Sequence, residues 1–248
     1  MNNSLYIEWN DPLKKVWRTV GKLSKLSDRY SFEYTKGALE SEKFVPFGLM
    51  TALDTTYESE ELFPLFANRL LNQSRPEYFS FLEWLNMDKD SDPLSILSVS
   101  QGVRGTDSLR VFSLPDMENG VYKSKFFVSG ISHVDSAVSE NFSSLKVGTP
   151  LYIMDDIQNE FPNALALRTD KPKSMIGYCP SFLSHHIKRY IGQDGVDIDI
   201  TIRQVNADAP SPYKILAELY IRGLVSQNAF DFEEYETIPK ENIQRVKS

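Results

Sequence analysis

A few side chains in the sequence have the types that catalysis or metal binding requires. Asp155-Asp156 is a carboxylate pair of the kind that holds Mg²⁺ in nucleases, but no second acidic cluster with a lysine accompanies it. His185-His186 falls in a segment expected to be helical, where adjacent side chains diverge, and no Cys, Asp or Glu stands at ligand spacing. Cys179, the single cysteine, lies beside a proline at the end of an apolar run and is expected to be a buried thiol. We therefore predict a chain that is not an enzyme and that holds no metal or cofactor, with a nuclease as the third-ranked alternative.

The charge of the chain is unevenly distributed. The whole sequence carries a net charge of −7. Residues 1–119 contain 13 Lys and Arg against 18 Asp and Glu, whereas residues 120–223 contain 11 against 11. Binding to phosphates needs clustered cations, so the acidic first part favours protein partners and the neutral second part leaves room for a local basic patch.

The first part of the chain has the pattern of a mixed strand and helix domain. Alternation predicts strands over Leu5–Ile7, Val16–Val20 and Tyr30–Tyr34, with a turn near Ser27-Asp28 and an irregular bridge over Phe44–Leu49. Three helical patterns then begin at Glu60-Glu61, at Ser74 with Pro76, and at Asp92-Pro93, and a strand follows over Leu109–Phe112. Turn residues from Pro115 to Gly120 indicate a domain boundary.

The second part is dominated by short strands. Turn residues separate the predicted strands at spacings typical of a small barrel or sandwich, and one helix is expected over Ser181–Ile191. The expected strands lie near Phe126–Val128, Pro150–Met154, Ala164–Leu167, Met175–Tyr178, Ile198–Val205 and Ile215–Ile221. The fold class is therefore predicted as α+β: a mixed domain over 1–117, a β-barrel-like domain with one helix over 118–225, and an acidic tail over 226–248 that is flexible until it docks.

Four motifs follow one another between residues 125 and 180. They are an aromatic strand with a small-residue turn, a leucine and a glycine before a strand, an acidic loop with an asparagine, and a Gly-Tyr strand ahead of the helix. Their sequences are Lys125–Ile131 (KFFVSGI), Leu145–Leu151 (LKVGTPL), Asp156–Leu167 (DIQNEFPNALAL) and Ile176–Pro180 (IGYCP). In this order and spacing they resemble a HIRAN domain, a small β-rich module that in relatives binds DNA ends.

The resemblance implies binding of single-stranded DNA or of DNA ends. Aromatic rings stack on bases and cations meet the phosphates. Because side chains alternate along a strand, we expect only one of Phe126 and Phe127 to be available for stacking. Asn159 could contact a nucleotide or cap its own turn. The candidate DNA-binding residues are Lys125, Phe126, Phe127, Asn159, Phe161 and Tyr178, with Arg168, Lys171 and Lys173 within reach of phosphates.

One loop departs from the family pattern. Glu160 replaces a proline that usually follows Asn159, and the family's aspartate is missing between Phe161 and Pro162. In relatives that loop helps to hold the terminal nucleotide. The departure therefore affects the recognition of a free end, which is one part of the implied function. The main alternative is a purely protein-binding subunit with a degenerate HIRAN domain.

Residues 1–117 more loosely resemble the N-terminal subdomain of HipA-type toxin kinases. The resembling motifs are Val20–Leu23 (VGKL), Tyr30–Tyr34 (YSFEY), Leu62–Leu71 (LFPLFANRLL) and Ser74–Pro76 (SRP). No kinase Gly-loop, HRD or DFG motif is present in the chain. The resemblance implies a subunit that binds and regulates a separate HipA-like serine/threonine kinase, as in toxin–antitoxin or phage-defence systems.

The helical segment Phe63–Trp84 is the expected partner-binding region of the first part. It is rich in large apolar residues, and a surplus of such residues usually marks an interface. Arg75 and Tyr78 are the expected partner-binding anchors. Arg69 with Arg75 could form an anion site, or could simply pair with nearby acidic groups.

The sequence also predicts where the protein is found. The first ten residues do not have the pattern of a signal peptide, and no apolar stretch approaches the roughly 18 residues that span a bilayer. We expect a cytoplasmic protein with no membrane partner.

Overall fold

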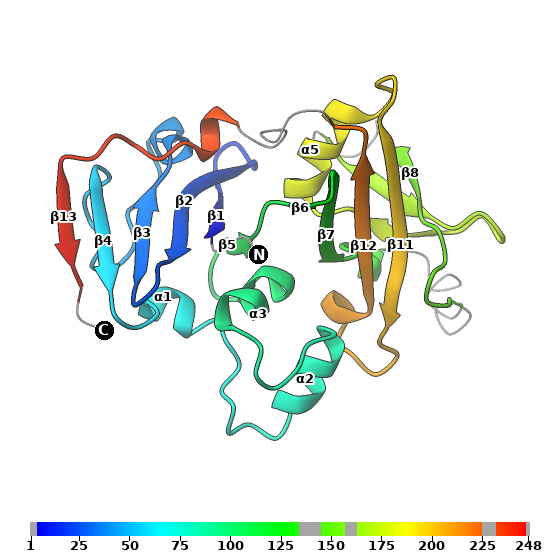
Figure 1. Cartoon of the computed structure of the whole chain (residues 1–248), viewed down its shortest axis with the longest axis horizontal. Coiled ribbons are helices and arrows are strands. Elements are labelled where there is room, and N and C mark those ends of the chain that lie inside the picture. Colours follow the sequence, from blue (N-terminus) through cyan, green and yellow to red (C-terminus); the bar gives the residue numbers. More distant parts are fainter. Residues whose placement is uncertain (1–3, 134–144, 157–162, 225–231, 247–248) are drawn as a thin grey trace. The chain divides into compact units, whose positions relative to one another are not determined.

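A computed structural model of the chain describes residues 4–133, 145–156, 163–224 and 232–246 (Figure 1). The chain divides into two compact units, which are described separately: unit 1 comprises residues 1–78, 90–114 and 230–248, and unit 2 comprises residues 79–89 and 115–229. Both contain strands and helices, so the predicted α+β class is confirmed. Across the ranges that the structure describes, no helix is long and apolar enough to cross a membrane.

Unit 1 is built on one six-stranded sheet with the order β13-β4-β3-β2-β1-β5. Neighbouring strands are antiparallel except β13, which pairs in parallel with β4. The predicted strands are confirmed, and β4 was not predicted. The bounds are β1 Ser4–Asn10, β2 Trp17–Lys25, β3 Tyr30–Tyr34, β4 Thr55–Ser59, β5 Leu109–Phe112 and β13 Asn242–Arg245.

Helices cover one face of this sheet, and the C-terminal segment lies on the other. Helices α1 (Pro64–Ala67) and α3 (Pro93–Ser100) contribute Phe66 and Leu97 to the same buried core as Phe32 of β3. On the opposite face Tyr6 of β1 packs against Tyr235, which belongs to the short 3-10 helix η5 (Glu233–Tyr235). The described part of the tail is therefore docked on unit 1.

The three helix predictions for the first part meet different outcomes. Helix α3 begins where Asp92-Pro93 predicts, because the Asp92 carboxylate accepts a hydrogen bond from the amide of Leu94 at 2.9 Å. The helix expected from Glu60 is a single turn, since α1 spans only Pro64–Ala67. The short helix α2 (Tyr78–Trp84) corresponds to the second predicted helix.

Unit 2 contains two sheets whose strands follow one another round an incomplete barrel. The amides of Ser129 and Tyr178 each donate to the other's carbonyl at 2.8 Å, which connects the end of β7 to β10. On the other side, an isolated bridge joins Pro150, just before β8, to Thr201 of β11. The sheets have the orders β11-β12-β7-β6 and β10-β9-β8, with β6 Asp116–Glu118, β7 Val121–Phe127, β8 Tyr152–Asp155, β9 Leu165–Arg168, β10 Met175–Tyr178, β11 Asp197–Val205 and β12 Ile215–Arg222.

The strands and the helix predicted for the second part are confirmed. The predicted inner face of this helix is Leu183, Ile187 and Ile191; α5 (Ser181–Tyr190) buries the first two, whereas Ile191 at its end is 47% exposed. Within the described residues the barrel is not closed by continuous pairing. The contact that Pro150 makes with β11 lies just before β8 and does not extend along that strand. The seam between β8 and β11 is therefore the place where the barrel opens.

Candidate nucleic-acid interface

Both phenylalanines predicted as alternatives for base stacking lie in the core of unit 2. Phe126 is 1% exposed and Phe127 is 3% exposed. Phe127 shares its strand face with the exposed Lys125, but at the end of β7 the ring of Tyr213 covers it, with the ring centroids 5.2 Å apart. The expectation that one ring of the pair is available is wrong, because Tyr213 buries the second face of the strand end.

The other predicted residues meet different outcomes. Lys125 is exposed on β7. Tyr178 is half-buried at the end of β10, and its hydroxyl donates a hydrogen bond of 2.9 Å to the carboxylate of Asp156. Asn159 and Phe161 lie outside the described residues. Tyr178 therefore stands next to the start of the loop that contains them.

Strand pairing places Tyr178 on one sheet face with Arg168, a predicted phosphate contact, and with two residues that the sequence did not single out, Tyr152 and Met154. Tyr178 pairs with Ala166 of β9, and Ala166 pairs with Met154 of β8. Side chains of directly paired residues share a face, and so do those two positions apart along a strand. Tyr152 and its partner Arg168 therefore belong to this face as well. We call the face formed by Tyr152, Met154, Arg168 and Tyr178 the platform.

The platform combines an exposed aromatic ring with positive charge. Tyr152 is 44% exposed, and the guanidinium of Arg168 lies 5.0 Å from its ring centroid. Arg168 also donates to the carboxylate of Asp170 at 3.4 Å. The exposed Lys171 and Lys173 follow in the turn between β9 and β10. Residues 164–180 carry three cations against the single anion Asp170, so the Arg168 end of the platform is locally basic, whereas the carboxylate of Asp156 lies at the other end beside Tyr178.

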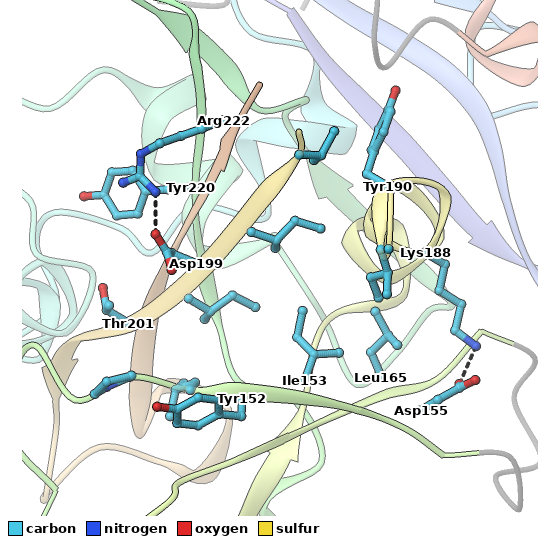
Figure 2. Close-up of a pocket in the computed structure, with 17 residues that line it drawn as sticks. Tyr152, Ile153, Asp155, Leu165, Lys188, Tyr190, Asp199, Thr201, Tyr220 and Arg222 are labelled. Atoms are coloured by element: carbon cyan, nitrogen blue, oxygen red, sulfur yellow. Dashed lines mark hydrogen bonds and ion pairs between the residues drawn. The ribbon is translucent and has the colours of Figure 1, made fainter. Parts of the chain in front are cut away.

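A groove of about 880 Å³ opens along the barrel seam beside β8 (Figure 2). Its lining includes Ile153 and Leu165 of β8 and β9, Lys188 and Tyr190 of α5, and Asp199 of β11. Tyr152 also lines it, so the groove and the platform meet at this residue, whereas the neighbouring Ile153 belongs to the opposite face of β8. We call this cavity the seam groove.

Each charged side chain in the walls of the seam groove has a partner of opposite sign. Lys188 pairs with Asp155 at 2.7 Å, and Arg222 pairs with Asp199 on the opposite wall (Figure 2). An anionic ligand would have to displace these carboxylates. The locally basic platform therefore suits a nucleic acid better than the seam groove does.

The side chains considered for catalysis or metal binding have the environments of structural groups. Burial lowers the pKa of His186 to about 3 and raises the pKa of the Cys179 thiol to about 12. Asp155 points to Lys188 and Asp156 accepts from Tyr178, so the two carboxylates serve different partners. Among the residues that the structure describes, no group of three His, Cys, Asp or Glu could hold a metal ion.

The residues considered for partner or anion binding in the first part are also placed. Tyr78 is buried, whereas Arg75 is exposed and lies 3.4 Å from the carboxylate of Glu77. Arg69 is buried and bonds the carbonyl of Gly102 and the carboxylate of Asp107, which is the ion-pairing alternative. The large apolar side chains of Phe63–Trp84 are buried or half-buried apart from Phe79, which is 63% exposed, so the segment offers little of the expected apolar surface. The exposed large apolar residues of unit 1 include Leu13, Leu26, Leu39, Val45, Leu49 and Val103.

Comparison with known proteins adds little to this description. No protein-family model and no curated protein sequence matches the chain. Among solved structures, the HIRAN domain of human HLTF aligns with a TM-score of 0.35 and 10% sequence identity, over 50% of this chain and 100% of that chain. A TM-score at this level does not establish a common fold.

Proposed function

We propose that the chain is a non-catalytic binding subunit whose platform in unit 2 holds single-stranded DNA. The observation that carries the proposal is the exposed ring of Tyr152, which has the guanidinium of Arg168 over it and is followed in the same sheet by the turn with Lys171 and Lys173. A base can stack on the tyrosine ring whatever its identity, while the three cations meet the phosphates. The predicted function is kept, but the stacking residue moves from the buried phenylalanines to Tyr152.

The width of the platform fits a short run of nucleotides. Tyr152 and Tyr178 lie on strands β8 and β10, with β9 between them. Neighbouring strands are about 4.8 Å apart, and the two tyrosines are also offset by two residues along the strands, so their positions are separated by roughly 12 Å. This spacing suits bases that are one or two positions apart in an extended single strand. The polar contact of Tyr178 with Asp156 holds its ring in place beside the β8–β9 loop.

The experiment measures anisotropy of a fluorescein-labelled oligonucleotide of about 12 nucleotides with the full chain. We expect saturable binding at low salt, and Tyr152→Ala should weaken it by about 1–3 kcal/mol because one stacked base is lost. Phe79→Ala is the matched control, since Phe79 is an aromatic residue of unit 2 that is 63% exposed and lies on α2 rather than on the platform. Absence of binding at about 50 mM salt would sink the proposal.

We propose further that unit 1 binds a HipA-like serine/threonine kinase encoded nearby. The net charge of −5 over residues 1–119 (13 cations against 18 anions) disfavours nucleic acid for this part, and Leu39, Val45 and Leu49 expose apolar surface within one short stretch. Arg75 is exposed and stays a candidate anchor in the proposal, whereas Tyr78 is buried and does not.

Size-exclusion chromatography after co-expression with the adjacent kinase-like product tests this partner. Co-elution with the wild-type chain should be lost in Val45→Asp, which places a charge in the exposed apolar stretch, and weakened in Arg75→Ala. Asp116→Ala, at an exposed position in unit 2, is the control. Separate elution of the two wild-type proteins at micromolar concentration would remove the basis of the kinase partnership.

A further inference from the structure

The outer edge of β11 is paired over only part of its length. Residues 148–151 run along it, and the amide of Leu151 donates to the carbonyl of Ile200 at 2.8 Å. Main-chain groups alternate between the two sides of a strand, so Ile198 directs its N–H and C=O to the same side as Ile200. Within the ranges that the structure describes, these two groups of Ile198 have no hydrogen-bond partner. The edge is therefore open at Ile198 and toward the start of β11.

The seam groove lies directly beside this open edge and is lined by apolar side chains. After Leu151 the chain leaves β11 and continues as β8, which opens the groove between the two strands. Ile153 and Ile198 line it half-buried, and Ile191 at the end of α5 is 47% exposed. Apolar surface and unpaired main-chain groups are thus exposed at the same place.

We propose that the open stretch of β11 binds an extended polypeptide segment of a partner protein by strand addition. The same edge already accepts such a segment, since residues 148–151 of this chain occupy its other half. Strand addition uses main-chain hydrogen bonds for affinity and pockets for alternate side chains for selectivity. The edge at Ile198 supplies the main-chain hydrogen bonds, and the groove lining supplies the pockets for side chains.

The groove also sets the chemistry of the segment. The open edge from Asp197 to Asp199 accommodates about three residues at roughly 3.3 Å each. Side chains at alternate positions point toward Ile153 and Ile191 and should be apolar. Because Lys188–Asp155 and Arg222–Asp199 are paired within the chain, the walls favour an uncharged segment. A nucleic acid has no repeating N–H and C=O groups to continue the ladder, and the residue proposed to stack on it, Tyr152, lies at the border of the groove.

The test uses the full chain and a small set of fluorescein-labelled hexapeptides that alternate Thr with Val, Ile, Leu or Phe. At least one should bind with a Kd below about 1 mM. The same peptide N-methylated at alternate residues keeps its side chains but loses its donors, and should bind at least about tenfold more weakly. Equal binding of the N-methylated peptide, or no binding by any of the set at about 1 mM, would overturn strand addition.

Two variants locate the site. Ile198→Pro removes the outward N–H without removing a bond of the β11–β12 ladder, so the sheet should persist, as circular dichroism can verify. It should weaken peptide binding by about tenfold, whereas the matched control Ile198→Val should stay within about twofold. Unchanged affinity in Ile198→Pro would place the peptide elsewhere and refute the inference.

Oligonucleotide binding separates this inference from the function proposed for the platform. Ile198→Pro should leave oligonucleotide affinity within about twofold, and Lys171→Ala with Lys173→Ala should leave peptide affinity within about twofold. Displacement of the bound peptide by an unlabelled oligonucleotide would show that the seam groove is the nucleic-acid site and would overturn the peptide assignment. Failure of the oligonucleotide to bind at all leaves the peptide result intact.

Discussion

The ring centroids of Tyr6 and Tyr235 lie 5.0 Å apart, so the C-terminal segment completes one face of a sheet that begins with the first described strand. Phe112 of β5 completes the aromatic cluster, 6.1 Å from Tyr235. The segment continues across the sheet edge, where β13 pairs with β4. Unit 1 therefore depends on residues from both ends of the chain.

Tyr235→Ala is expected to destabilise unit 1 by about 3–5 kcal/mol, because a buried ring is removed from an aromatic cluster. Urea unfolding followed by tryptophan fluorescence in a Trp84→Phe background reports on this unit, since Trp9 and Trp17 belong to it and Trp84 belongs to unit 2. Glu233→Ala, at an exposed position of the same short helix, is the control and should change stability by less than about 0.5 kcal/mol. A loss no larger than that of the control would mean that the tail is dispensable for unit 1.

Acid should destabilise unit 2 through His186. Burial lowers the pKa of His186 to about 3, helped by the nearby His185 and Arg189, whereas the unfolded chain titrates near its ordinary value of about 6.5. Below that pH, His186 takes up a proton in the unfolded state, whereas it stays neutral in the folded state. The stabilising contribution is thus complete above about pH 6.5 and is lost as the pH falls toward 3, by up to about 1.4 kcal/mol per pH unit.

His186→Leu removes this titration, and the slope of unfolding free energy between about pH 6 and about pH 4.5 should become shallower. His185→Gln, at the neighbouring half-buried position where burial also lowers the pKa, should change this slope by less than His186→Leu does. Identical slopes in His186→Leu and wild type would contradict the assignment of the buried group.

Local signals in the sequence predicted the elements well. Asp92-Pro93 fixes the start of α3 because a cap acts within a few residues, and turn residues separate the strands of unit 2. β4 escaped prediction because Thr55–Ser59 contains one large apolar residue and gives no apolar alternation. Helix α1 stops after one turn, although the apolar spacing continues to Leu70.

The candidate site could not be predicted from local patterns. Tyr152 and Tyr178 share the platform only because β9 pairs with both of their strands in a particular register, and a one-residue slip would place them on opposite faces. In the same way, the burial of Phe127 depends on Tyr213, a residue distant in the sequence. A signal for Tyr152 existed in the alternation of its strand, but the sequence does not say which face of that strand is exposed.

Cys179 should resist modification in the native protein. Its thiol is buried, and burial raises the pKa to about 12, so almost no thiolate is present at neutral pH. Reaction with Ellman's reagent should be slow in buffer and complete in denaturant. A double variant, Cys179→Ala with Ser181→Cys, moves the thiol to an exposed position and should react quickly in buffer. Fast labelling of the wild type would contradict the burial of this residue.

Salt dependence distinguishes phosphate contacts on the platform from stacking. Lys171 and Lys173 are exposed in the turn beside Arg168, and a cation that contacts a phosphate releases a counterion on binding. Each such contact contributes about −0.7 to the slope of log K against log salt for a single strand. Lys171→Ala with Lys173→Ala should therefore make the slope shallower by about 1.4, whereas Tyr152→Ala should weaken binding with little change in slope. Oligonucleotide anisotropy between about 50 and about 200 mM salt measures both quantities.

Lys14→Ala with Lys15→Ala, in an exposed turn of unit 1, is the matched control and should leave the slope unchanged. If both lysine pairs change the slope equally, binding is a general charge effect and the platform has no special part in it.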